Sequence, residues 1–89
     1  MIRTPLVISN KLGLHARASA KLTKLASSFK CEIFMSRNGR RVNAKSIMGI
    51  MMLTAGLDSE MELETEGEDE QQAAEQIVAL VNDKFGEGQ

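Results

Sequence analysis

The sequence predicts an α+β domain, an open-faced two-layer sandwich in which an antiparallel sheet is covered on one face by helices. Its candidate strands alternate apolar and polar residues, as strands do when one sheet face is in water. The elements follow in the order strand, helix, strand, strand, helix, strand, helix, which favours two layers. With 89 residues, the chain is long enough for one core. We therefore expect a single domain over residues 1–89, whose last residues, 86–89, fray.

The first two elements are a strand and a helix. In residues 2–9 apolar side chains alternate, and Pro5 lacks the N–H that a central strand needs, so this strand belongs at a sheet edge. Residues 16–29 have the apolar spacing of an amphipathic helix, carried by Ala18, Leu22, Leu25, Ala26 and Phe29. Arg17, Lys21 and Lys24 mark another face of this helix, which is either a docking surface or simply solvated.

Residues 31–44 predict a β-hairpin. Two alternating segments flank Asn38-Gly39, a pair that tolerates the positive φ angles of a tight turn. Cys31, at the start of the hairpin, is the only cysteine and therefore has no partner for an internal disulfide. Because the chain also has a single histidine, we expect no metal site and interpret Cys31 as a small apolar strand residue.

A short helix should follow the hairpin, with Ser46 as its N-cap and Gly56 closing it. This segment is apolar almost all round, so it has more apolar side chains than one face can bury. Two interpretations stay open. Either all of these side chains are core, or Ile47, Met48 and Met51 form an exposed patch, for which adaptable methionine side chains are well suited.

The last strand and helix complete the layers. In residues 60–66, Met61, Leu63 and Thr65 face one way and four glutamates face the other, so the outer side of this strand should lie in water. Asp69 and Gln72 form an acceptable capping pair for the last helix. The buried stripe of that helix is predicted to be Ala73, Ile77, Leu80, Val81 and Phe85.

Charge is unevenly distributed along the chain, although the net charge is only −1. Of 11 basic residues, 10 lie between Arg3 and Lys45, and of 12 acidic residues, 11 lie from Asp58 onward. A basic surface steers acidic partners and suits an anionic ligand. The alternative is that both halves are ordinary solvated faces, which is the interpretation we prefer for the acidic half. There is no stretch of about 18 apolar residues and no secretory pattern at the N-terminus, so we expect a cytoplasmic protein without membrane insertion.

His15 is the strongest candidate for chemistry, because it follows a glycine-containing turn and opens a helical pattern. A helix start has unpaired N–H groups and a positive partial charge, which favour anions and the neutral imidazole. A neutral imidazole has a nucleophilic nitrogen that can accept a phosphoryl group. The N–H groups of Ala16, Arg17 and Ala18 and the guanidinium of Arg17 would then hold the phosphate. The alternative is that His15 is only a cap or a solvated surface residue.

Two separated motifs, Gly13-Leu14-His15-Ala16-Arg17 and Lys45-Ser46-Ile47-Met48-Gly49, together resemble HPr, the histidine-containing phosphocarrier family of the bacterial phosphotransferase system. The resemblance covers nearly the whole chain. It implies four strands in the order 1-4-2-3 with three helices on one face, and a monomer without metal or cofactor. It also implies that His15 takes phosphate from phosphorylated enzyme I, originally from phosphoenolpyruvate, and passes it to enzyme IIA. Such a protein is a transfer intermediate more than an enzyme.

The resemblance further implies how partners and regulators use the surface. Docking residues would be Ala20, Lys24, Ile47, Met48 and Met51, and Ser46 would be the residue on which HPr kinase/phosphorylase acts. Family chemistry places the phosphate on Nδ1 of the histidine. One departure is Ala18, where the family often has proline; alanine keeps its N–H and favours a helix, so the site should survive.

Two other functions remain as alternatives. The phosphate could serve a nitrogen-related regulatory branch instead of sugar uptake, since both branches share the His15 motif. A small nucleic-acid-binding module using the basic first half is the alternative from another class. The chain has no Trp or Tyr and only three Phe, and no recognised stacking motif, so we expect no nucleic-acid partner.

Overall fold

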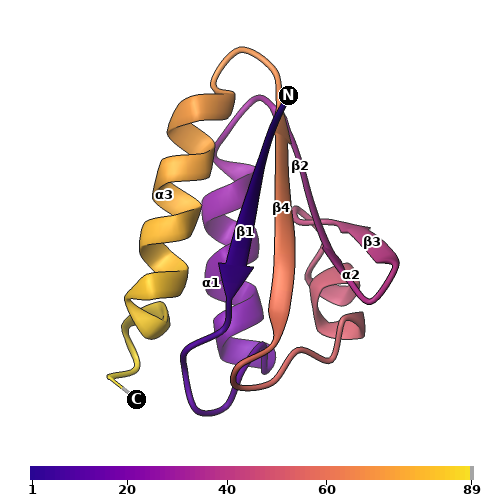
Figure 1. The fold of residues 1–89 in the computed structure, drawn as a ribbon. Coiled ribbons are helices and arrows are strands. Elements are labelled where there is room, and N and C mark those ends of the chain that lie inside the picture. Colours follow the sequence, from indigo (N-terminus) through magenta and orange to yellow (C-terminus); the bar gives the residue numbers. More distant parts are fainter. Residues whose placement is uncertain (89) are drawn as a thin grey trace.

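The computed structural model describes residues 1–88 and has a four-stranded antiparallel sheet in the order β1-β4-β2-β3. The strands are β1 (Ile2–Val7), β2 (Glu32–Arg37), β3 (Arg40–Asn43) and β4 (Glu60–Glu66). The helices are α1 (Ala16–Ser27), α2 (Ile47–Met52) and α3 (Glu70–Asn82), followed by the 3-10 helix η1 (Lys84–Gly86). Helices α1 and α3 lie behind the sheet, and α2 packs against α1 beside β3 (Figure 1). The predicted fold class and strand order are confirmed.

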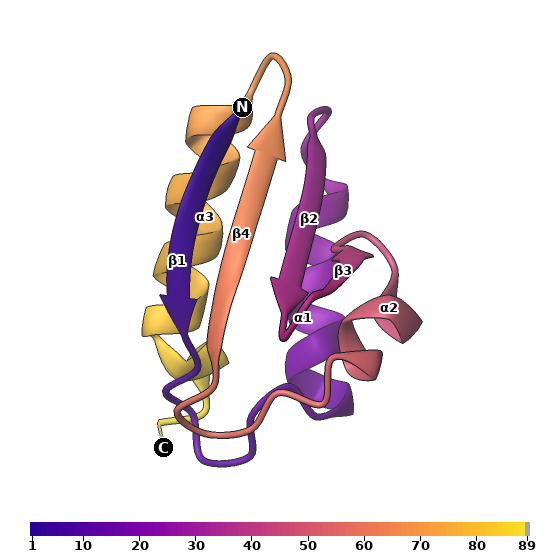
Figure 2. The ribbon, with the colours of Figure 1, turned by 45° about the vertical axis from the view of Figure 1, so that its right-hand side comes forward.

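Local sequence signals explain the outer strands. Pro5 lies in β1, which pairs only with β4 and therefore forms an edge, as predicted. Asn38 and Gly39 join β2 to β3 with φ angles of 51° and 83°, the left-handed pair of a tight hairpin turn. Figure 2 shows β1, β4 and β2 side by side, with β3 crossing at the far edge.

The core lies between the sheet and helices α1 and α3. The stripe predicted for α1 is buried at Ala18, Leu22 and Ala26, and Cys31 is buried at the start of the hairpin. Large side chains that are fully buried come from every layer: Ile8, Leu22, Ile33, Met35, Ile50, Leu63, Ile77, Val81 and Phe85. Burial and the nearby carboxylate of Asp69 raise the pKa of the Cys31 thiol to about 11, which keeps this side chain neutral within the core.

The predicted capping pair of Asp69 and Gln72 is not formed. The side chain of Asp69 does not cap α3; instead its carboxylate accepts hydrogen bonds from the N–H groups of Lys30 and Cys31, both at 2.9 Å. These hydrogen bonds hold the pKa of Asp69 below its ordinary value, and the bond from Lys30 has the largest effect. The side chain of Glu70 accepts a bond from the N–H of Gly67 at 3.1 Å. Asp69 therefore ties the start of α3 to the segment that leads into β2.

Two further expectations differ from the structure. Glu64 was expected in water with its neighbours, but it is buried under Arg41, whose guanidinium donates to it at 2.9 Å and lies 3.7 Å from the centre of the Phe34 ring. Helix α2 does not end through Gly56; Leu53 is its C-cap, and Thr54 takes the positive φ of 50°. Glu60, Glu62 and Glu66 are exposed as predicted.

Gly13 generates the first testable prediction. It has a φ of +64°, and a Cβ there would lie 2.3 Å from the carbonyl oxygen of Ala55. Gly13→Ala should therefore lower the free energy of unfolding by about 3 kcal/mol or more, because backbone strain and a backbone collision add. Urea denaturation measures this loss.

Gly39→Ala is the matched control, since Gly39 has a φ of +83° but nothing within 4 Å of its added Cβ. It should cost only the left-handed strain, about 1 kcal/mol. Equal losses for the two variants would show that the contact with Ala55 has no energetic weight.

Candidate functional site

His15 is the N-cap residue of α1, with φ −72° and ψ 178°. Its carbonyl accepts the N–H of Ser19 at 2.9 Å, which begins the helix, but its side chain makes no capping hydrogen bond. The helix start therefore keeps the unpaired N–H groups that attract anions. The interpretation of His15 as a side-chain cap is wrong.

The loop before His15 is held by contacts that local sequence patterns do not predict. Asn10 is fully buried, and its Nδ2 donates to the carbonyl of Gly13 at 2.8 Å. The N–H of Leu14 donates to Ala55 at 2.8 Å, and Ser19 Oγ donates to the carbonyl of Leu14 at 3.0 Å. Because these contacts come from both sides of the loop, the backbone at His15 has a defined position.

Glu87 completes the site, although it lies 72 residues from His15 in the sequence. Its Oε2 is 2.5 Å from His15 Nε2, and its Oε1 accepts from Asn10 Nδ2 at 3.0 Å. Glu87 and Gly86 therefore have defined contacts, which differs from the fraying expected for residues 86–89; Gln89 lies outside the described residues. Only the acidic character of this tail could have signalled the contact from sequence.

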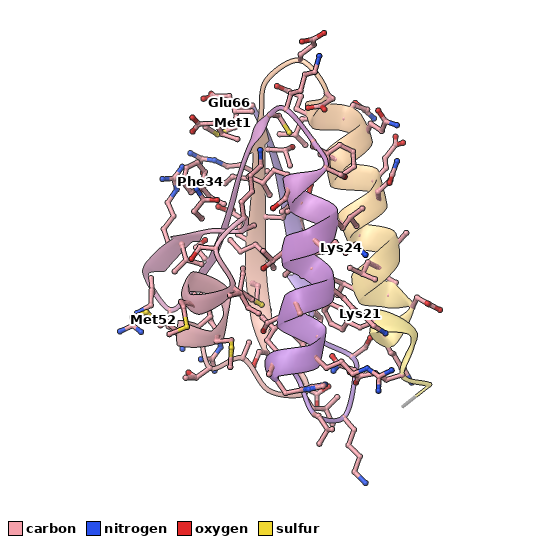
Figure 3. All side chains as sticks on the ribbon, turned by 180° about the vertical axis from the view of Figure 1, so that it is seen from behind. Met1, Lys21, Lys24, Phe34, Met52 and Glu66 are labelled. Carbon is pink, nitrogen blue, oxygen red and sulfur yellow. The ribbon has the colours of Figure 1, made fainter. Side chains whose placement is uncertain are left out.

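A left-handed turn directs Glu87 toward His15. Helix α3 ends at Asn82, and Lys84, Phe85 and Gly86 then have φ angles of 55°, 54° and 75°. Phe85 is fully buried in this turn rather than on a continuing helix, and its carbonyl accepts from Lys21 Nζ at 2.6 Å. Figure 3 shows Lys21 on α1 beside the end of α3. The buried Phe85 ring and the hydrogen bond from α1 thus hold this turn against the rest of the fold.

The site has basic side chains, Lys11 and Arg17, close to the carboxylate of Glu87. A hollow at the helix start is lined by Lys11, Leu12, His15, Arg17, Gly86 and Glu87. Partial burial by itself raises the pKa of Glu87, but hydrogen bonds from Asn10 and His15 and the nearby charge of Lys21 outweigh it, so this pKa lies below its ordinary value. The His15 side chain keeps 28% of its surface exposed, so a partner can reach it.

The structure brings the predicted phosphate-binding residues together with His15. Arg17 is exposed in the first turn of α1 and lines the same hollow as His15. Ala16 and Ala18 belong to that first turn, where Ala18 is buried and Ala16 exposed. Residues 1–88 contain no group of three or more His, Cys, Asp or Glu that could hold a metal ion.

The predicted docking residues lie on α1 and α2. Ser46 is the N-cap of α2, and its Oγ accepts the N–H of Gly49 at 3.2 Å. Ile50 and Leu53 are buried, whereas one side of α2 is exposed, formed by Ile47, Met48, Met51 and Met52. The interpretation that all apolar residues of this segment are core is therefore wrong. On α1, Ala20 and Lys24 are exposed.

Comparisons with known proteins agree with these motifs. The family model for the PTS HPr component phosphorylation site matches residues 2–83. The chain is similar to phosphocarrier protein HPr of Cupriavidus necator, at 58% identity over all of both chains, and to that of Neisseria meningitidis, at 52%. A crystal structure of HPr from Thermoanaerobacter tengcongensis matches with a TM-score of 0.95 and 42% identity, covering 98% of each chain. Among the described residues, no helix is long and apolar enough to cross a membrane.

Proposed function

Because the chain belongs to the HPr family of phosphocarrier proteins of the phosphotransferase system, we propose that His15 is the residue that carries the phosphoryl group. The observation that supports this most directly is an accessible imidazole beside uncapped helix N–H groups. The donor in this proposal is phosphorylated enzyme I, and the acceptor is a histidine of an enzyme IIA domain. The protein acts as a transfer intermediate in a single HPr-like domain.

The chemistry needs only a nucleophilic nitrogen and a way to hold three phosphoryl oxygens. The lone pair of one ring nitrogen attacks phosphorus while the bond from phosphorus to the donor breaks, and the electron pair of that bond stays with the donor. The N–H groups of Ala16, Arg17 and Ala18 then face the oxygens. The Arg17 guanidinium adds donors in a planar geometry that suits phosphate. Transfer to enzyme IIA reverses these steps.

The exposed side of α2 is the proposed docking surface, together with the nearby face of α1. Ile47, Met48 and Met51 offer flexible apolar contacts, and Ala20 and Lys24 extend the surface along α1. Helices α1 and α2 pack against each other, which supports a surface continuous with the His15 site. We propose that the protein is a monomer, because transient docking requires this surface to be free between partners. We also propose that it acts in the cytoplasm.

The relatives support a general phosphocarrier and do not specifically favour the nitrogen-related branch. Family membership also favours phosphoryl transfer over the nucleic-acid-binding alternative. Sugar uptake through enzyme IIA is therefore the proposed role.

Ser46 is proposed as a second, regulatory phosphorylation site, for a kinase of the HPr kinase/phosphorylase type. Support comes from its motif and from its exposed position at the start of α2, beside Ile47 and Met48. A phosphate there would be favoured by the helix start. The phosphate would therefore not destabilise the fold, but its charge would weaken docking, since a partner would have to desolvate it.

His15→Ala tests the central proposal. Incubation with phosphoenolpyruvate, magnesium and enzyme I should add one phosphoryl group to the parent, labile to acid and stable to base, as expected for a phosphoramidate. The Ala variant should take none while keeping the circular dichroism of the parent. Mass spectrometry at neutral pH measures this addition, and equal labelling of the two proteins would disprove the proposal.

Arg17→Lys separates geometry from charge. Lysine keeps the positive charge but lacks the planar pair of donors, so phosphate exchange with enzyme I should slow by about tenfold while folding is unchanged. Arg3→Lys is the matched control, because Arg3 lies exposed in β1 and outside the hollow. If both variants exchange phosphate at the parental rate, Arg17 contributes only a surface charge and no specific geometry. Rapid quench of the labelled protein gives these rates.

Ser46→Asp imitates the regulatory phosphate weakly. It should slow phosphorylation of His15 by enzyme I without lowering the melting temperature, because a negative charge suits a helix start but not the docking surface. Gln72→Glu adds the same charge to the first turn of α3 and should leave the rate unchanged.

The Ser46→Ala variant isolates the cap. Losing the bond to Gly49 should cost about 1 kcal/mol in urea denaturation. If Ser46→Asp exchanges phosphate at the parental rate and no kinase labels the parent, Ser46 is a cap alone.

A further inference from the structure

Glu87, the carboxylate in contact with His15, lies outside the part of the chain that the family model matches. That model matches residues 2–83, whereas Glu87 follows the left-handed turn after α3. Figures 1 and 2 both place the C-terminal segment at the same end of the molecule as the loop after β1. The chain therefore supplies its phosphate-transfer site with a residue that its family motifs do not predict.

We propose that Glu87 is a positioning residue for His15, which fixes the imidazole in the tautomer that has its proton on Nε2. This inference rests on the proposed function, because it concerns how His15 receives a phosphoryl group. With Nε2 occupied by the proton, Nδ1 has the free lone pair and becomes the attacking nitrogen.

The tautomer follows from the chemistry of the two groups. An ionised carboxylate only accepts hydrogen bonds, and a neutral imidazole has a single N–H. The short contact between Glu87 Oε2 and His15 Nε2 therefore requires the proton on Nε2. The lowered pKa of Glu87 keeps its carboxylate ionised at neutral pH, which supports this assignment. A free imidazole in water has no such constraint and exchanges between both tautomers.

The same carboxylate also acts on the charge that develops during transfer. When Nδ1 bonds to phosphorus and the bond from phosphorus to the donor breaks, the ring keeps its Nε2 proton and becomes positively charged. Glu87 faces that proton and stabilises the charge, as carboxylates do when they orient a reacting histidine. When the phosphoryl group leaves for an acceptor, the ring becomes neutral again and the proton remains on Nε2.

The surroundings of Glu87 are built to hold this geometry. Asn10 donates through one nitrogen both to Glu87 Oε1 and to the carbonyl of Gly13, so the loop before His15 and the carboxylate share one anchor. The buried Phe85 and its bond from Lys21 fix the backbone two residues earlier. The Glu87 side chain is only 13% exposed, which strengthens its hydrogen bonds relative to those of a solvated group.

Glu87→Ala tests the proposal, with Glu68→Gln as a charge control. Glu68 is exposed in the turn between β4 and α3, at the opposite end of the molecule. The first measurement is the nitrogen chemical shifts of the His15 ring in the free protein, at a mildly alkaline pH where imidazole is neutral. The parent and Glu68→Gln should show the Nε2–H tautomer alone, whereas Glu87→Ala should show a mixture of the two.

The second measurement is single-turnover phosphorylation by phosphorylated enzyme I. Glu87→Ala should slow it by about tenfold or more, the loss typical of removing such a partner. Glu87→Gln keeps an oxygen acceptor without the charge, so it should retain the tautomer and lie between the parent and the Ala variant in rate. If Glu87 had a purely structural role, replacing it would leave the tautomer unchanged and would not place the Gln variant between the parent and the Ala variant in rate.

Three outcomes are separable. If Glu87→Ala keeps the Nε2–H tautomer, or if it transfers phosphate at the parental rate while folded, the inference is overturned. A mixed tautomer with a slowed rate supports it. If the parent itself takes no phosphate from enzyme I, the proposed function fails, and with it the role of Glu87 in transfer. Labelling of the His15→Ala variant tests the proposed function separately, because it shows whether another residue carries the phosphoryl group.

Discussion

The close approach of Gly13 to the backbone of Ala55 is the constraint on which the functional end of the molecule depends. No side chain fits between the two segments, and the N–H of Leu14 bonds to the Ala55 carbonyl directly after the glycine. This contact joins the loop that starts α1 to the loop that follows α2 (Figure 2). As a result, the imidazole of His15 and the exposed side of α2 belong to one rigid end of the protein, although they lie more than 30 residues apart in the sequence.

The charge separation along the sequence does not become two oppositely charged halves of the fold. Strand β4 carries much of the acidic segment, but it lies between β1 and β2, where Arg3 pairs in register with Glu64. Arg41 then covers Glu64 from β3. Glu64 is therefore neutralised locally by a basic residue of the neighbouring hairpin. Because α1 has no acidic residue, its basic face remains positive at the end of the molecule that holds His15.

The sequence predicts those features that depend on neighbours along the chain. Strand alternation, the Asn38-Gly39 turn and the Ser46 cap each involve residues within four positions, so local rules suffice. Asp69, Glu64 and Glu87 could not be placed in this way, since their partners come from other elements. For Glu87 the difficulty is greater, because Lys84 and Phe85 adopt left-handed backbone conformations that side-chain-bearing residues rarely take. Helical periodicity correctly predicts that Phe85 is buried. It wrongly predicts that the helix continues to Phe85, because α3 ends at Asn82 and the chain then turns back.

A phosphocarrier has to bind its phosphoryl group well enough to receive it and weakly enough to give it away. If His15 carries that group as proposed, the imidazole lies between two opposing influences. The N–H groups of the first turn of α1 and Arg17 attract the phosphoryl oxygens on one side of the ring. On the other side, Glu87 stabilises the positive ring but adds a negative charge that repels the phosphoryl dianion. The N–H groups and Arg17 attract the phosphoryl group most strongly once it is bound to His15. Glu87 stabilises the ring earlier, while the bond between nitrogen and phosphorus is still forming. A carboxylate in this position would therefore stabilise the charged ring while offsetting part of the attraction for the phosphoryl group, so that phosphohistidine is not a stable end point, as reversible transfer between two partners requires.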